Sequence, residues 1–287
     1  MTGWRGELEA MVRADLPPEV AGAFARLPLR PAVRLSHAGE GDPVVGHLGG
    51  PARLPVGMPW PVLGGWPLML IAALDCAALA AHEVDLALPD NGSLLFFLPH
   101  PEGDEIASPP VIYVPEGTAT ADQYVPEPLR DHWVGERGYP FVPLTGRTVA
   151  TAPRSYSPAL GVDLESIQAL SDLLWHQSYG GTSVDEVIGR YLGDGPDHQV
   201  GGHSDAFQHP LEISAAYAAR RSPMGSNLYE DPTFLAEARE WVTLLQLDED
   251  TDARMGWGDG GIAMWAIRRD DLARQHFDAV FFTVDSH

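Results

Sequence analysis

The apolar run EWVTLLQLD at residues 240–248 decides how this sequence is interpreted, because a run of the same form, PLMLIAALD, occurs at residues 67–75. Each run has the length and composition of a buried strand, and each ends in leucine followed by aspartate. An aspartate–glycine turn then leads into a second apolar run in both places, DGGIAMWAI at 259–267 and DNGSLLFFL at 90–98. Both pairs of runs are typical of β-hairpins.

A glycine-rich segment precedes the first strand in both places, HLGGP at residues 47–51 and QVGGH at 199–203. Glycine turns before apolar strands are common, but three elements in the same order predict an internal duplication. We place the N-terminal repeat unit at about residues 46–98 and the C-terminal unit at about 198–285. Between them lies a proline-rich insertion at about 101–158.

The remaining sequence predicts short helices around this core. Helical spacing over residues 7–27 is interrupted at Pro17 and Pro18, which indicates two short helices. Ser183, with Glu186 three residues later, forms a capping-box pattern at the start of a further helix. Strands broken by clustered helices, without regular alternation, favour an α+β fold. We therefore expect a single domain over 1–287, with an internally duplicated, mostly antiparallel sheet core and flanking short helices.

The charge of the chain excludes several partners. It has 40 acidic and 18 basic residues, giving a net charge of −22. A field of this sign repels DNA, RNA and anionic membranes, so we expect neither a nucleic acid nor a membrane as partner. It would accelerate the approach of a basic protein or peptide. The alternative is that the acidity only keeps the protein soluble.

The composition also excludes several activities. All the basic residues are arginine, so a P-loop, a pyridoxal Schiff base and a protein-kinase phosphate clamp are ruled out. A single cysteine, Cys76, excludes an internal disulfide and cysteine-rich zinc sites. The longest apolar run, residues 66–74, is shorter than the roughly 20 residues that span a membrane. The N-terminal residues lack a signal-peptide pattern, so we expect a cytoplasmic protein.

The acidic loop that joins the two strands of the C-terminal unit carries the spacing of a cation site. Asp248, Asp250, Asp252 and Asp259 occupy positions 1, 3, 5 and 12 of a calcium-loop pattern. Position 6 is Ala253 rather than glycine, and strands flank the loop, which excludes an EF-hand. A looser calcium or magnesium site and a solvated acidic hairpin remain as alternatives.

A cluster of histidines and aspartates lies upstream of this loop. It could supply zinc ligands, although its spacing fits no helical ligand pair, or it could consist of ordinary core and loop histidines. Its members are Asp197, His198, His203, Asp205 and His209.

Trp257 is the aromatic residue most suggestive of binding. It lies between Gly256 and Gly258, and an indole on a glycine loop is a plausible anchor for a partner. The other aromatic residues of the two units, Trp60 among them, are expected to belong mostly to the core. Together with residues of the repeat motifs, they give a candidate binding set of Trp257, Asp259, Gln246, Gln208 and Trp60.

The repeat motifs also resemble the YwqG-like family, bacterial proteins whose domain is of unknown function. The resemblance is carried by GGPARLPVGMPWP at 49–61, LMLIAALDCAAL at 68–79, HQVGGHSDAFQ at 198–208 and the hairpin around MGWGDGGIAMWAI at 255–267. It implies an α+β fold with a duplicated sheet core, and it supplies no catalytic residues. The first repeat of the family usually carries a glutamine where this chain has Ala73, whereas its counterpart Gln246 is retained.

Three functions follow as hypotheses, the third being a purely structural or regulatory scaffold, which nothing in the sequence separates from the first. The first is a non-catalytic bacterial binding protein for a basic protein or peptide, of which an immunity protein against a cationic toxin is one form. The second is a metal-dependent enzyme that uses calcium, magnesium or zinc at the acidic loop 248–259. The sequence leaves the oligomeric state open.

Overall fold

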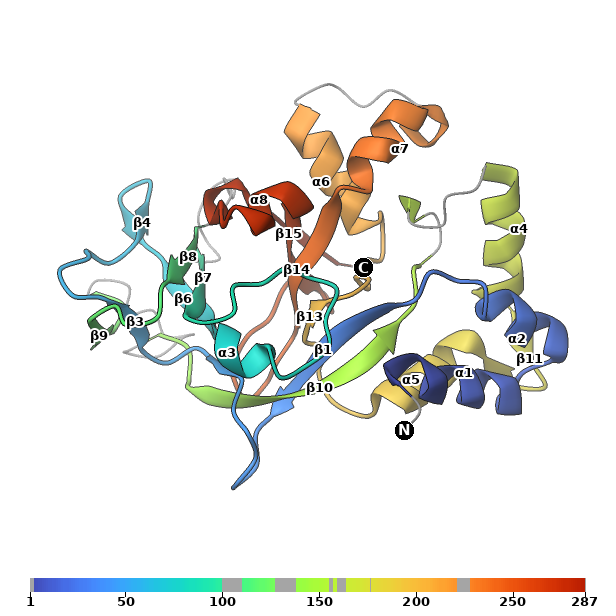
Figure 1. Cartoon of the computed structure of the whole chain (residues 1–287), viewed down its shortest axis with the longest axis horizontal. Coiled ribbons are helices and arrows are strands. Elements are labelled where there is room, and N and C mark those ends of the chain that lie inside the picture. Colours follow the sequence, from blue (N-terminus) through green and yellow to red (C-terminus); the bar gives the residue numbers. More distant parts are fainter. Residues whose placement is uncertain are drawn as a thin grey trace.

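The computed structural model describes residues 3–99, 110–126, 138–154, 157–158, 164–175, 177–220 and 228–286. Within these residues, ten strands form one curled antiparallel sheet, and most of the helices lie at one end or along one side of it (Figure 1). The predicted α+β class is confirmed. The helices are α1 (Trp4–Asp15), α2 (Pro18–Phe24), α3 (Cys76–Leu79), α4 (Leu164–Leu174), α5 (Val184–Leu192), α6 (Leu211–Arg220), α7 (Pro232–Ala238) and α8 (Arg269–Ala273), with 3₁₀ turns η2 (Leu228–Glu230) and η3 (Phe277–Ala279).

The order across the large sheet is β16-β15-β14-β13-β1-β10-β2-β6-β7-β8, and three two-stranded sheets, β3-β9, β4-β5 and β11-β12, lie outside it. The strands of the large sheet are β1 (Arg30–His37), β2 (Gly46–Leu48), β6 (Met69–Asp75), β7 (Ser93–Leu98), β8 (Val111–Val114), β10 (Val142–Thr151), β13 (Gln199–Gly201), β14 (Trp241–Asp248), β15 (Ile262–Arg268) and β16 (Phe281–Asp285). The short pairs are β3 (Ala52–Pro55) with β9 (Thr120–Gln123), β4 (Val62–Leu63) with β5 (Trp66–Pro67), and β11 (Ser178–Tyr179) with β12 (Thr182–Ser183).

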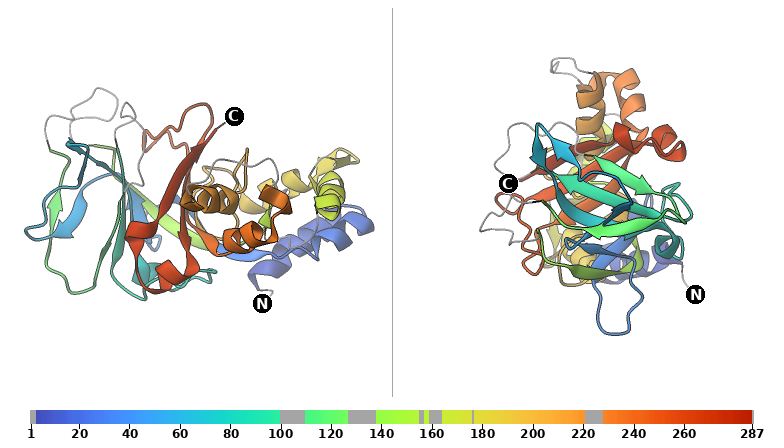
Figure 2. Two further views of the ribbon diagram at one scale, coloured as in Figure 1. Left: turned by 90° about the horizontal axis from the view of Figure 1, so that it is seen from above. Right: turned by 90° about the vertical axis from the view of Figure 1, so that its left-hand side faces the viewer.

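The central strands β1 and β10 connect the body of the sheet to the helical end of the molecule, where α1, α2, α4 and α5 lie (Figure 2). Apolar side chains of these helices pack around Ala32, Val149 and Ala150 of the two strands. On the other half, α6 and α7 cover β14 and β15 around Trp241 and Met264. The largest apolar cluster lies within the curl of the sheet and includes Trp265. The curl therefore buries one face of the sheet, while the other is covered by helices in the C-terminal half and at the helical end, and by the segment with β3, β4 and β5 in the N-terminal half.

The sheet is symmetric about the β1–β10 pair, since β13, β14, β15 and β16 follow β1 as β2, β6, β7 and β8 follow β10. Gln199 of β13 lies opposite Gln246 of β14, and their counterparts in the sequence match, His47 and Ala73, lie opposite each other in β2 and β6. Both hairpins also carry a register shift at the same place, between Leu70 and Ala72 and between Thr243 and Leu245. We infer from these registers that the two halves form a structural duplication.

The glycine-rich segments have the same conformation in both halves. Gly49 and Gly50 have positive φ, as do Gly201 and Gly202, a region that residues with a Cβ rarely adopt. The Nδ1 atom of His47 hydrogen bonds to the carbonyl of Gly49 at 2.8 Å, and the side-chain amide of Gln199 donates to the carbonyl of Gly201 at 3.1 Å. One side chain thus closes each glycine turn.

Strand β1, at the centre of the sheet, was not predicted, because Arg34 interrupts its apolar pattern. That arginine is buried because it pairs with Asp197, a residue far away in the sequence. The proline-rich segment supplies β8 and β10 to the large sheet and β9 to a short pair; its residues 101–109, 127–137 and 155–156 lie outside the described structure. In the part of the chain that is described, no helix is long and apolar enough to cross a membrane.

Candidate functional site

A cavity of about 1190 Å³ lies beside the C-terminal half of the sheet. One wall is formed by α5 and the loop that follows it, and the other by the loop 203–210 that leads into α6. Among the described residues, the lining carries one arginine, Arg154, and six carboxylates: Asp185, Asp194, Asp197, Asp205, Glu212 and Glu230. Trp175, Phe207 and Tyr229 add aromatic surface to it. The cavity is therefore strongly acidic.

The first wall begins with a helix whose ends are both fixed. The hydroxyl of Ser183 accepts from the backbone N–H of Glu186 and the Glu186 carboxylate accepts from that of Ser183, which confirms the predicted capping box. At the other end, a guanidinium nitrogen of Arg147 donates to the carbonyls of Tyr191 and Leu192, at 3.2 and 3.1 Å. A cation at a helix C-terminus is favourable, because the unpaired carbonyls there carry partial negative charge.

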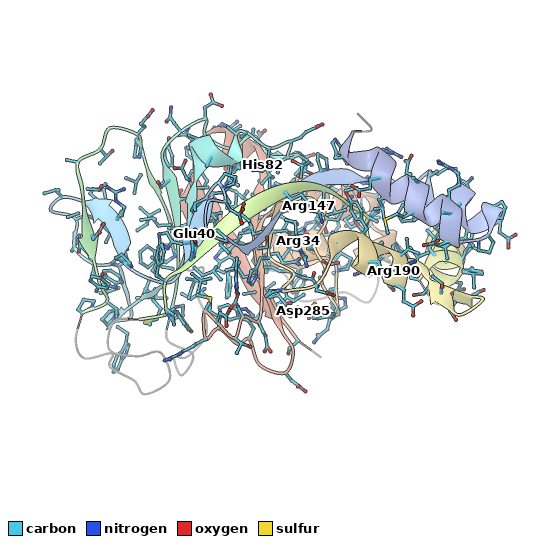
Figure 3. The ribbon with its side chains drawn as sticks, turned by 90° about the horizontal axis from the view of Figure 1, so that it is seen from below. Arg34, Glu40, His82, Arg147, Arg190 and Asp285 are labelled. Atoms are coloured by element: carbon cyan, nitrogen blue, oxygen red, sulfur yellow. The ribbon has the colours of Figure 1, made fainter. Side chains whose placement is uncertain are left out.

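A second arginine fixes the far end of the loop after α5. Arg34 lies directly opposite Arg147 across the β1–β10 pair, so both side chains project from the same face of the sheet. Figure 3 shows the two arginines close together in the middle of the molecule. Arg34 is buried and forms an ion pair with the carboxylate of Asp197, whose backbone N–H donates to Asp248. The paired arginines thus hold both ends of the 193–197 loop.

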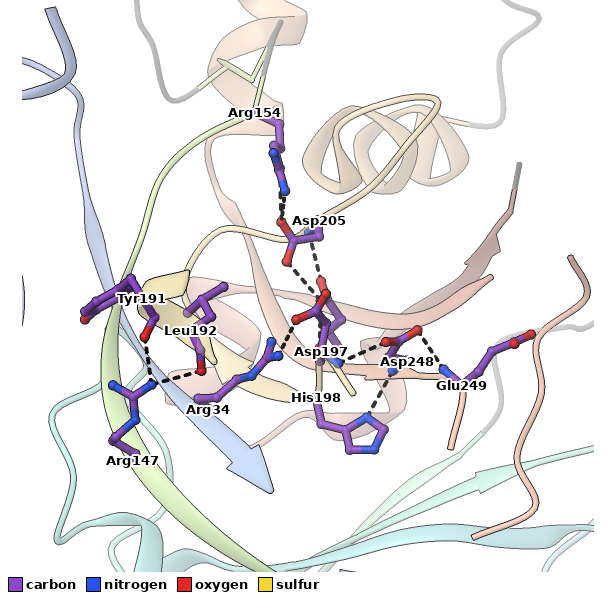
Figure 4. Close-up of polar contacts among 11 residues, drawn as sticks. Arg34, Arg147, Arg154, Tyr191, Leu192, Asp197, His198, Asp205, Asp248 and Glu249 are labelled. Atoms are coloured by element: carbon purple, nitrogen blue, oxygen red, sulfur yellow. Dashed lines mark hydrogen bonds and ion pairs between the residues drawn. The ribbon is translucent and has the colours of Figure 1, made fainter. Parts of the chain in front are cut away.

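Gln246 connects the two walls beneath the cavity, and its side chain is fully buried. Its Nε2 donates to the carbonyl of Asp197 at 2.9 Å and also lies 3.4 Å from the Asp205 carboxylate. Its Oε1 accepts from the backbone N–H of Asp205 at 2.9 Å. Figure 4 shows Asp197 and Asp205 close to each other, with Arg154 above them and Arg34 below. One amide therefore sets the relative position of two acidic side chains.

The second wall is held by side chains from several different strands. Gln199 donates to the carbonyl of His203 at 2.7 Å, and the hydroxyl of Thr151 accepts from the N–H of His203 at 2.8 Å. Further along, the carboxylate of Asp285 accepts from the backbone N–H groups of Phe207 and Gln208, at 2.6 and 3.0 Å. Because these contacts are made within the protein, the wall has its shape before any ligand arrives.

Arg154 already holds two of the carboxylates. Its Nε and one terminal nitrogen donate to the same oxygen of Asp205, at 3.0 and 2.9 Å, and its other terminal nitrogen donates to Asp185. Its guanidinium carbon lies 5.5 Å from the centroid of the Trp175 ring. Burial opposes the charge of Arg154, but Asp205 and Asp185 outweigh it and raise the pKa. The cavity therefore already binds one guanidinium, that of its own arginine.

Asp197 and Glu212, two further carboxylates of the lining, each have a raised pKa. For Asp197 the largest cause is burial. Together with the charges of Asp205 and Asp248, burial outweighs the opposing effect of Arg34 on the pKa. For Glu212 the cause is burial. A raised carboxyl pKa means that the ionised form is less favourable here than it is in water. A cation that bound beside these carboxylates would favour the ionised form.

His203 contributes a neutral acceptor to the lining. Its Nε2 lies 2.8 Å from the carbonyl of Pro28, which only accepts, so this nitrogen carries the proton and Nδ1 does not. Burial, followed by the charge of Arg30, lowers the pKa of His203 to about 3. Within the described residues, Nδ1 has no hydrogen-bond partner. The six carboxylates and Nδ1 of His203 are therefore groups of the described lining that accept without donating.

The structure places the predicted binding residues in different environments. Gln208 lines the cavity and Gln246 lies beneath it. The exposed Asp259, together with Trp60 and Trp257, is outside the described lining. The indole N–H of Trp60 donates to the carbonyl of Leu68 and its ring packs on Phe97, in the other half of the sheet.

Trp257 is a core residue rather than an exposed anchor, which corrects the sequence interpretation. It is 9% exposed, packs in the largest apolar cluster, and donates its indole N–H to the carbonyl of Asp248 at 3.0 Å. The flanking glycines do not isolate the indole, because the loop folds it back against the sheet. Cys76 is buried, and burial, followed by the charge of Asp75, raises the pKa of its thiol to about 12.

The four aspartates predicted as metal ligands do not converge. Asp248 accepts from the backbone N–H groups of Asp197 and Glu249, while Asp252 and Asp259 are exposed. Asp250 is buried, which contradicts the alternative of a solvated acidic hairpin at this position. Among the described residues, no group of three or more His, Cys, Asp or Glu side chains is arranged to hold a metal ion.

Asp250 instead joins two histidines. Its carboxylate oxygen lies 2.6 Å from Nε2 of His37 and 3.0 Å from Nε2 of His198, and its other oxygen accepts from the backbone N–H of Ala253. Because Nδ1 of His198 accepts from the N–H of Asp248, His198 is neutral and donates to Asp250. Burial opposes the charge of Asp250, but the hydrogen bonds from His198, Ala253 and His37 lower its pKa. This cluster ties the acidic loop to β1 and β13.

Sequence reasoning missed most of the cavity. Arg154, Asp185, Asp194, Trp175 and Arg34 were not proposed, and Asp197 and Asp205 were considered only as zinc ligands. The available signal was the density of acidic residues between 185 and 212 and the glycines among them. It did not identify the site, because acidic residues are frequent throughout this chain.

A family model described as "Domain of unknown function (DUF1963)" matches residues 46–286. The chain belongs to this family. The match includes the repeat units and the cavity loops but begins after α1, α2 and β1, so Arg34 lies outside it. The narrower YwqG-like resemblance stays a prediction. No curated protein matches the chain.

We predict that Gln246→Leu destabilises the protein by about 2–4 kcal/mol, because it leaves the N–H of Asp205 and the carbonyl of Asp197 without their partner. The free energy of unfolding from urea titration measures this effect.

Thr243→Val on the same strand is the control. The Thr243 hydroxyl is buried and has no hydrogen-bond partner among the described residues, so this variant should change stability by less than about 1 kcal/mol. Equal effects of the two substitutions would contradict the role assigned to Gln246.

Proposed function

We propose that this protein is a non-catalytic binding protein whose acidic cavity holds a basic segment of a protein or peptide partner. The observation that carries the proposal is the lining, whose described residues include six carboxylates and one arginine, with Arg34 and Arg30 reaching Asp197 and Glu212 from outside it. The net charge of −22 would add long-range attraction for such a partner. Neutralisation of a basic toxin is one concrete form that this function can take.

The size of the cavity supports a segment rather than a single small cation. Small-molecule pockets measure roughly 300–1,000 Å³. The cavity here, at about 1190 Å³, has room for several side chains of a partner. Phe207 is 44% exposed in its lining and provides an apolar surface on which the stems of long basic side chains can pack.

The chemistry of the lining supports arginine as the main group recognised. A guanidinium carries five N–H donors and no acceptor, which complements a wall of carboxylates. Arg154 illustrates the arrangement, with two carboxylates and the face of Trp175 around one guanidinium. Because the two walls are fixed by internal hydrogen bonds, little entropy would be lost in ordering them.

The proposal is tested with a peptide of nine arginines as the probe, titrated into the protein at low ionic strength by calorimetry. Asp194 is the exposed carboxylate of the lining on the loop after α5, and Asp194→Asn should weaken binding about fivefold, close to 1 kcal/mol. Asp90→Asn removes an exposed aspartate from the other half of the sheet and should leave the affinity within about twofold.

Equal weakening by the two substitutions would show that the probe binds the acidic surface at large, and the cavity proposal would then be wrong. Failure of the probe to bind the unaltered protein would also refute it.

The affinity should depend on pH through the carboxylates with raised pKa. A cation binds the ionised carboxylate, so the affinity for the probe is full at neutral pH. It falls as the pH drops through the pKa of Asp197, which is raised above that of an ordinary aspartate. Below neutrality, binding of the nine-arginine probe should release protons. Calorimetry in two buffers with different ionisation enthalpies measures the number released. Unchanged affinity between pH 7 and pH 4 would contradict the assignment of Asp197.

A further inference from the structure

A second hollow adjoins the acidic cavity. It has a volume of about 730 Å³ and is lined by Gly181, Thr182, Glu186, Gly189, Arg190, Gly193 and Asp194. Three of these residues, Gly189, Gly193 and Asp194, also line the acidic cavity. The two spaces are therefore neighbours that meet along α5 and the start of the loop after it.

The divide between them carries almost no side chains. A Cβ added at Gly189 or at Gly193 would meet no atom within 4 Å. Gly193 ends α5 with a positive φ of 85°, a conformation that favours glycine. Gly189 has no such requirement, because it lies within the helix, where glycine is less favourable than alanine. Its absent side chain leaves the passage open.

The second hollow is lined by two carboxylates and one guanidinium. Its charged residues are Glu186, Asp194 and Arg190. Arg190 already pairs with Asp15 at 2.6 Å, outside the hollow's lining. Asp194, at the divide, borders both spaces.

We propose that the basic partner binds as an extended chain that leaves the acidic cavity over Gly189 and Gly193 and continues into the second hollow. This inference rests on the proposed function and specifies that the basic segment is extended and reaches beyond the acidic cavity. Gly189 then determines the length of chain recognised, because its missing side chain keeps the two spaces continuous.

The test compares peptides of three and nine arginines, which span at most about 11 Å and 32 Å. Gly189→Trp places a large side chain on the divide. We expect it to lower the affinity for the long peptide about tenfold more than the affinity for the short peptide. The long peptide can bind in more registers than the short one, but this difference is the same for the unaltered protein and for the variant. A change in the ratio of the two affinities therefore reports on the divide.

Gly22→Trp is the matched control, because Gly22 also lies within a helix, α2, and an added Cβ there meets nothing within 4 Å. It should change neither affinity. Gly189→Leu serves as a second variant with a good helix-forming residue, in case the indole prevents folding.

An unchanged ratio in the folded Gly189 variants would overturn the extended-chain inference while leaving the acidic cavity in place. Loss of short-peptide binding in those variants would also overturn it, because Gly189 would then act within the cavity. Absence of binding of either peptide to the unaltered protein would refute the proposed function itself.

Discussion

The amide of Gln246 is the contact on which the acidic cavity depends. Two loops that each present an aspartate are joined by one buried side chain, which accepts from the backbone of Asp205 and donates to the backbone of Asp197. Bringing carboxylates together in a partly buried place is unfavourable unless cations or hydrogen bonds compensate. Arg34 pairs with Asp197 and Arg154 with Asp205, yet burial, with the charges of Asp205 and Asp248, still raises the pKa of Asp197. The residual negative charge is what a basic partner can use.

Differences between the two halves of the sheet explain why the cavity lies beside the C-terminal half. Gln246 and its counterpart Ala73 have equivalent positions in the strand registers, but alanine has no amide to hold two loops. When the sequence match of the glycine segments is extended by two residues, Arg53 aligns with Asp205. The charge at this position is therefore reversed between the two halves. In the first half, the face around Ala73 is instead filled by Leu95, Phe97 and their apolar neighbours. We infer that one half of the duplication serves binding and the other serves packing.

Short sequence patterns predicted the helices and strands that are determined by residues close together in the sequence. The paired prolines separated α1 from α2, the Ser183 pattern marked the start of α5, and the apolar runs gave β6, β7, β14 and β15. Strand β1 was missed because the burial of Arg34 depends on Asp197, and that partner is brought close only by the fold. The same limit applied to Trp257 and Asp250, since glycine neighbours and acidic spacing do not reveal which way a loop turns. The cavity itself combines residues from 154 to 230, so no short motif describes it.

The most direct test of the account is an NMR titration of ¹⁵N-labelled protein with the peptide of nine arginines. The account predicts that backbone amide signals shift mainly in the loops 193–198 and 203–208 and along α5, while those of β6, β7 and β8 stay in place. Small shifts spread evenly over the acidic surface, or shifts concentrated in the first half of the sheet, would contradict it, because the charge of the chain rather than its cavity would then be responsible for binding.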